Sequence, residues 1–115
     1  MVAQQQQGDS RPMPDTIIAP RIERVPPDFE GESWRTGRLE GLMAHDISRL
    51  LGGIEPDVGD ATSDPEKVAY EWWVLIDGCA VNIWSYKGAE RVGGWSTYGP
   101  ASALRAVFGE HYTNG

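Results

Sequence analysis

Six side chains in the second half of the chain are the best candidates for contact with a binding partner. They are Glu71, Trp73, Asn82, Trp84, Tyr86 and Trp95. Trp and Tyr bury a large area on contact and keep one polar group, so they often anchor protein interfaces. We interpret Trp73, Trp84 and Tyr86 as anchors, Glu71 and Asn82 as groups that set orientation, and Trp95 as a residue at the border of the surface.

Five of these residues lie on a predicted β-hairpin. Residues 68–87 form two β-favouring runs joined by Asp77-Gly78, and this dipeptide accepts the positive φ angles of a type I′ turn. The turn fixes the register of the two strands. The predicted pairs are Ile76 with Cys79, Val74 with Val81, Trp73 with Asn82, Trp72 with Ile83, Glu71 with Trp84, and Tyr70 with Ser85.

The hairpin is expected to have one core face and one spare face, because side chains alternate along a strand. Tyr70, Trp72, Val74, Ile76 and their partners, including Cys79, make the apolar core face. Trp73 and Trp84 are diagonal neighbours on the other face. Three alternatives remain open for that face: cover by the chain's own N-terminal arm, cover by a protein partner or a second copy, or a small ligand such as a nucleotide stacked between Trp84 and Trp95.

Two helices and one further strand complete the predicted domain. Apolar residues at helical spacing predict a helix over residues 36–52, with Thr36 as its N-cap, Trp34 packed on its first turn and Gly52-Gly53 as its end. A short strand at 95–98 precedes a helix that begins at Gly99-Pro100 and ends at Gly109. The predicted fold is therefore α+β: a small antiparallel sheet, made of the hairpin and a short third strand, covered by two helices.

Residues 1–33 are predicted to be an extended or disordered N-terminal arm, and residues 34–115 a single α+β domain. The arm contains a run of four glutamines and five prolines, which oppose helix formation. It also contains Ile17, Ile18, Ile22 and Val25. Apolar residues are unusual in a purely solvating tail, so docking on the globule or on a partner is the alternative to disorder.

The charge of the chain is negative and uneven. The net charge is −7, and residues 39–115 hold eleven acids against five bases. Five of those acids lie in residues 55–66, which favours a solvated acidic loop, with a nucleic-acid mimic as the alternative. Such a chain repels phosphate backbones, so direct nucleic-acid binding is not expected.

No enzyme signature is present in the sequence. The motifs of serine hydrolases, P-loop proteins, zinc proteases and dinucleotide-binding folds are all missing. His45 and His111 lie in different predicted elements with no nucleophile beside them, and the single cysteine, Cys79, provides neither a disulfide nor a zinc site. We expect no enzyme activity, no cofactor and no metal.

The sequence favours a cytoplasmic protein. No apolar run approaches the roughly 20 residues that a membrane span needs. The first residues, MVAQQQQGDSRP, lack the basic start and apolar stretch of a secretory signal. We therefore expect no membrane association.

Residues 66–109 resemble a group of small, largely uncharacterised phage and prophage proteins. The pattern shared with that group is EW, DG, a strand ending in YK, and a W…G segment followed by a short helix. The residues that carry it are Glu71, Trp72, Asp77, Gly78, Ile83, Trp84, Tyr86, Lys87, Trp95 and Gly99. Eight arginines against two lysines suit a GC-rich host such as an actinobacterium.

The resemblance and the missing catalytic groups favour a small, non-enzymatic phage accessory protein that binds another protein. The leading hypothesis is a modulator or inhibitor of a host protein, located in the host cytoplasm. Two alternatives remain: a virion or assembly component that docks through its N-terminal arm, and a nucleotide binder. A homodimer is also compatible with the spare aromatic face.

Overall fold

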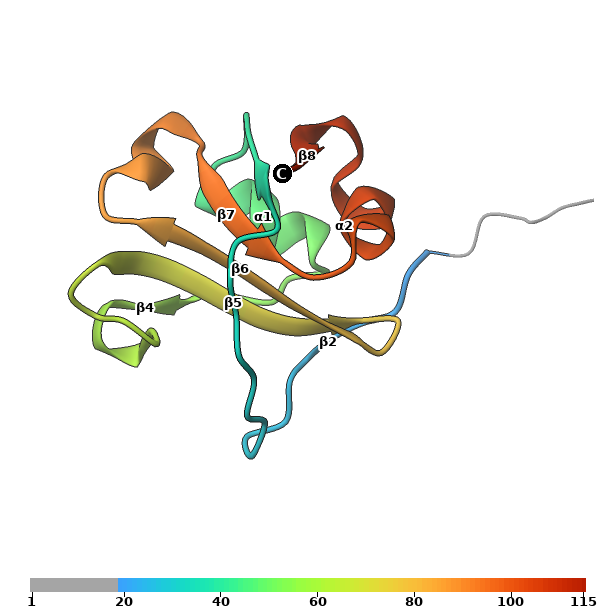
Figure 1. The fold of residues 1–115 in the computed structure, drawn as a ribbon, viewed down its shortest axis with the longest axis horizontal. Coiled ribbons are helices and arrows are strands. Elements are labelled where there is room, and N and C mark those ends of the chain that lie inside the picture. The colour runs from blue at the N-terminus through green and yellow to red at the C-terminus, as the bar shows by residue number, and fades with distance from the viewer. Residues whose placement is uncertain (1–18) are drawn as a thin grey trace, which may run out of the picture.

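The computed structural model describes residues 19–115 of the chain, and these residues form one seven-stranded, antiparallel sheet with two short α-helices (Figure 1). The first eighteen residues of the predicted arm, with the glutamine run, lie outside the described part. The elements in chain order are β2 (Ile22–Arg24), β3 (Gly37–Leu39), α1 (Ala44–Leu50), β4 (Asp57–Val58), η1 (Gly59–Ala61), β5 (Val68–Ile76), β6 (Cys79–Tyr86), η2 (Ala89–Val92), β7 (Trp95–Tyr98), α2 (Ala101–Phe108), η3 (Gly109–His111) and β8 (Tyr112–Asn114).

The sheet order is β2-β5-β6-β7-β3-β8, with β4 paired to β5 beside β2. The hairpin β5–β6 is its centre, and the turn at Asp77 has the positive φ of 49° that the sequence predicted. All six predicted pairs across the hairpin are present, from Ile76 with Cys79 to Tyr70 with Ser85. The predicted short strand at 95–98 is also confirmed as β7.

The core lies between the helices and one face of the hairpin. Trp72, Val74, Ile76, Val81 and Ile83 are almost fully buried there. They pack against Ile47 of α1, against Leu42 and Leu51 on either side of that helix, and against Leu104 and Phe108 of α2. Cys79 lies on the same face but at the tip of the hairpin, where it is exposed rather than buried as expected.

The predicted fold class is wrong in its sheet, which has seven strands among the described residues rather than three. The four missing strands, β2, β3, β4 and β8, are two or three residues long. Strands this short show no detectable alternation, and β2, β3 and β8 pair with strands distant in the sequence. The helices are correspondingly minor, with seven residues in α1 and eight in α2.

The helix predicted over 36–52 is confined to its second half. Thr36 is no N-cap, because its backbone N–H donates to Thr97 O at 2.8 Å and the chain continues into β3. Leu39 belongs to that strand, where it pairs with both Trp95 and Tyr112. The strand and the helix are separated by Gly41, whose φ of +79° interrupts both structures.

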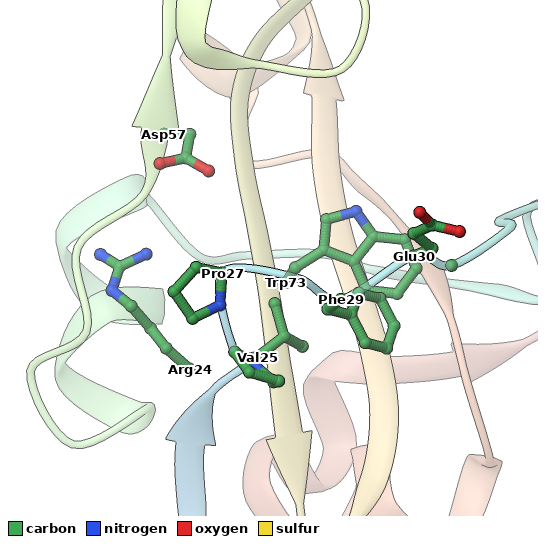
Figure 2. A pocket seen from close by; sticks show the side chains of 9 residues that line it. Arg24, Val25, Pro27, Phe29, Glu30, Asp57 and Trp73 are labelled. Atoms are coloured by element: carbon green, nitrogen blue, oxygen red, sulfur yellow. The ribbon is translucent and has the colours of Figure 1, made fainter.

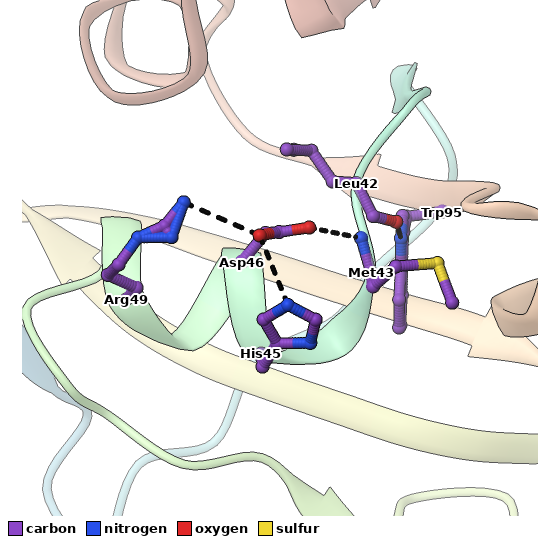
Figure 3. Close-up of polar contacts among 6 residues, drawn as sticks. All are labelled: Leu42, Met43, His45, Asp46, Arg49 and Trp95. Atoms are coloured by element: carbon purple, nitrogen blue, oxygen red, sulfur yellow. Dashed lines mark hydrogen bonds and ion pairs between the residues drawn. The ribbon is translucent and has the colours of Figure 1, made fainter.

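The start of α1 is fixed by two hydrogen bonds (Figure 3). The Asp46 carboxylate accepts a bond from the backbone N–H of Met43 at 2.9 Å, which caps the first turn. The indole N–H of Trp95 donates to Leu42 O at 2.7 Å. Trp95 on β7 therefore ties the entry of this helix to the sheet.

Candidate functional site

The candidate site is the outer face of the sheet, which we define as the face of β5, β6 and β7 opposite the core. Residues 25–36, which we call the strap, cross this face from β2 to β3, and Figure 1 shows them passing in front of β5 and β6. The strap is tied at both ends: Val25 N–H donates to Trp73 O at 3.4 Å, and Thr36 N–H donates to Thr97 O. Pro26 and Pro27 have no N–H, so the pairing of β2 with β5 cannot continue beyond Val25.

A row of four aromatic rings runs along the outer face. We call Phe29, Trp73, Tyr98 and Trp34 the aromatic row; two come from the strap, one from β5 and one from β7. Their ring centroids are 5.1 Å apart for Phe29 and Trp73, 6.2 Å for Trp73 and Tyr98, and 4.8 Å for Tyr98 and Trp34. Trp34, predicted to pack on a helix, packs edge-on against Tyr98 instead and is 60% exposed.

Asn82 lies beneath the aromatic row. It pairs with Trp73 on one side and with Tyr98 on the other, and it is only 2% exposed. Its amide donates to Glu71 Oε2 at 3.1 Å and to Trp72 O at 2.9 Å, and its carbonyl oxygen accepts a bond from Ser33 Oγ at 2.8 Å. The strap is therefore fastened to the sheet by a polar contact as well as by aromatic packing.

The Glu71 carboxylate is buried beside Asn82. It accepts three hydrogen bonds, from Ser63 N at 2.8 Å, from Ser63 Oγ at 2.9 Å and from Asn82 Nδ2. None of the ion pairs among the described residues involves Glu71. The carboxylate thus anchors the loop after η1 to the sheet, and within residues 19–115 hydrogen bonds rather than an ion pair stabilise it.

Four of the six sequence-predicted residues line one small hollow of about 220 Å³. These are Glu71, Asn82, Trp84 and Tyr86, with Ser33 and Ser63 beside them. Trp84 is 8% exposed, whereas Tyr86 is 49% exposed at the end of β6. The hollow is lined by hydroxyl, amide and carboxylate groups, which can donate and accept hydrogen bonds.

The other two predicted residues lie apart from this hollow. Trp73 belongs to the aromatic row, in partial contact with solvent. Trp95 is 3% exposed on the core face, where it packs against Trp72 at a centroid distance of 5.4 Å. Since Ile83 and Trp84 pair with Thr97 and Ser96 respectively, Trp84 and Trp95 lie on opposite faces of the sheet. No base can stack between these two rings.

Sequence reasoning missed Phe29, Tyr98 and the exposed position of Trp34. Tyr98 was within reach of the alternation rule, since it lies two residues from Ser96 and therefore on the face of Trp84. Phe29 lacked such a signal, because the segment around it has no period. Gly31 is part of the same arrangement: a Cβ there would lie 2.5 Å from Phe29 Cε2 and 3.2 Å from Trp73 Cη2.

Two structural limits apply to the described residues. Within residues 19–115, no three His, Cys, Asp or Glu side chains come together as a metal site requires. Over the same range, neither helix has the length and apolar character to span a bilayer.

Comparison of the chain with protein-family models, with curated proteins and with solved structures finds no match.

Proposed function

We propose that this chain is a non-enzymatic binding protein that docks on another protein through its aromatic row. The observation that carries this proposal is the 60% exposure of Trp34, whose ring continues a row of three partly buried aromatic side chains. An exposed Trp supported from below by Tyr is typical of the anchor of an interface. The resemblance of residues 66–109 to small phage and prophage proteins supports a host protein as the partner and modulation of that protein as the role.

The charge distribution supports a foreign partner over a second copy. Asp28, Glu30 and Glu32 lie in the strap before Trp34 and are all exposed. A dimer through the aromatic row would bring two such acidic segments together in a molecule of net charge −7. Like charges at an interface oppose association, so the proposal is a partner with a complementary basic region.

The test is affinity capture from a host lysate with three tagged proteins: the parent chain, Trp34→Ala and Val92→Ala. Val92 is 83% exposed on η2, outside the aromatic row, and serves as the matched control. We expect the parent chain and Val92→Ala to retain the same host protein. That protein should bind Trp34→Ala with an affinity reduced about tenfold or more. The captured protein is then purified, and its binding is mapped by hydrogen exchange of the strap.

Two outcomes would contradict this proposal. Equal retention by all three proteins would place the contact away from the aromatic row. A concentration-dependent dimer in analytical ultracentrifugation that Trp34→Ala abolishes would identify a second copy as the occupant.

A further inference from the structure

A hollow of about 520 Å³ opens at one end of the aromatic row (Figure 2). It lies at the edge of the sheet, where β2 has ended and β4 pairs further along β5. Trp73 and Phe29 form its aromatic wall, and Val25, Pro26 and Pro27 form the adjoining apolar wall. The hollow is therefore an open, aromatic-lined recess with room for one long side chain.

Carboxylates flank this recess on two sides. Figure 2 shows Asp57, from β4, and Glu30, from the strap, on opposite sides of the Trp73 ring. The third charged residue of the lining is Arg24, whose Nη2 already donates to Glu55 O at 2.6 Å. The lining thus carries a net charge of −1, and the exposed Asp28 and Glu32 add to the negative field around it.

The indole N–H of Trp73 is a further polar group at the recess. The indole groups of Trp72 and Trp95 donate to backbone carbonyls, Ile54 O and Leu42 O. No hydrogen bond within residues 19–115 uses the indole N–H of Trp73. A peptide that entered the recess would meet an aromatic face, two carboxylates and one N–H donor for a carbonyl oxygen.

We propose that this recess receives an arginine side chain of the partner protein, an inference that rests on the proposed function. A planar guanidinium can lie on the indole face and still direct in-plane N–H groups to carboxylates on both sides. The lysine ammonium is a compact, strongly hydrated point charge that has no planar face to stack on the indole. The aromatic wall between Asp57 and Glu30 therefore fits a guanidinium better than an ammonium.

The test is a titration of the ¹⁵N-labelled full chain with N-acetyl-arginine amide, followed at the Trp73 indole N–H resonance. The variant Trp73→Phe assigns that resonance among the indole signals. The matched probe is N-acetyl-citrulline amide, which has the same shape without the charge, and N-acetyl-lysine amide tests the geometry. A single side chain on an open surface binds weakly, so we expect a saturable shift with a dissociation constant on the order of millimolar.

The arginine probe should shift the Trp73 resonance, and the citrulline probe should not. Glu30→Gln and Asp57→Asn should each weaken the response about two- to fivefold, as expected for an exposed ion pair. Neither side chain makes a hydrogen bond or ion pair among the described residues, so both variants should fold. An equal response to citrulline, an equal response to lysine, or no response at all would overturn the assignment.

This result can be separated from the fate of the proposed function, because the probe needs no partner protein. If arginine fails while capture still depends on Trp34, the docking function stands and the recess is not its arginine subsite. If the probe binds while capture is independent of Trp34, the recess recognises guanidinium and the proposed function fails.

Discussion

At the scale of single residues, Glu71 is a buried, hydrogen-bonded polar group of the outer face, and its substitution should destabilise the fold. Its carboxylate is 4% exposed and accepts three hydrogen bonds. Glu71→Gln replaces one accepting oxygen with an NH₂ group that faces the amide of Asn82 or the donors of Ser63. A buried polar group without its partner costs about 1–3 kcal/mol, so we expect that loss in the free energy of unfolding measured in urea.

The control for this substitution is Glu66→Gln, in the loop before β5. Glu66 is exposed, and surface substitutions of this kind change stability by about 0.5 kcal/mol or less. A Glu71→Gln variant as stable as Glu66→Gln would show that the network of Ser63, Glu71 and Asn82 contributes little to the fold.

Asp46 gives the stability of the chain a dependence on pH in the acid range. The hydrogen bond from the N–H of Met43 does most to lower the pKa of Asp46 below its ordinary value of 3.8 (Figure 3). Desolvation opposes this shift, and the nearby charges of His45, Arg49 and His111 add smaller downward contributions. Because the pKa is lower in the folded state, the stabilisation is complete above the unfolded pKa and is lost as pH falls through the folded pKa. The parent chain should therefore exceed Asp46→Asn in stability at neutral pH.

Unfolding of both proteins in urea over a pH series checks this prediction. The difference in unfolding free energy should shrink as the pH falls below 3.8. A difference that stays constant through the acid range would rule out titration of Asp46 as its cause.

At the scale of elements, the hairpin could be predicted because its information is local. The Asp77-Gly78 turn lies between its two strands, and the turn alone sets the register of all pairs confirmed in β5 and β6. The strands β3 and β8 have no such signal, because Gly37–Leu39 pairs with residues almost sixty or more positions later. Leu39 even fits the helical spacing of the residues that follow it, which is why a helix was expected there.

The sequence predicts which side chains share the outer face, but it does not predict that the strap crosses this face. Alternation placed Glu71, Trp73, Asn82 and Trp84 together, as the structure does. The strap that crosses them has neither a helical nor a strand period, so no pattern in its sequence indicates that Phe29 meets Trp73. Contacts of this kind depend on where the chain returns in space, which one sequence does not reveal.

The strap should loosen when its central hydrogen bond is removed. Ser33→Ala deletes the donor to Asn82 Oδ1, which lies beneath Trp73 and Tyr98. We expect a loss of about 1 kcal/mol of stability and faster hydrogen exchange in residues 29–35 than in β5 or β6. Ser102→Ala, an exposed position in α2, is the control and should change neither quantity. Unchanged exchange in Ser33→Ala would mean that the aromatic contacts and the backbone hydrogen bonds at its two ends hold the strap without this bond.

At the scale of the whole molecule, the sheet is completed by strands from both ends of the described chain. β2 pairs with one edge of the hairpin, and β8 forms the strand at the opposite end of the sheet by pairing with β3. The chain therefore has to return to β3 with its last residues before the sheet is complete. Such long-range pairings form late and slowly compared with a local hairpin.

Removal of β8 should therefore expose the edge of β3 and weaken the core. Truncation after His111 deletes Tyr112, which is 5% exposed in the core and carries the Arg105 guanidinium over its ring at 5.4 Å. Loss of a buried aromatic side chain costs about 3–5 kcal/mol, and the bared edge of β3 becomes a site for association with other chains. Tyr112→Ala separates the two effects, because it loses the ring and keeps the backbone of β8. Both variants should unfold at lower urea concentration, while light scattering should detect association in the truncated chain alone; equal scattering by both would assign the association to the damaged core instead of the edge.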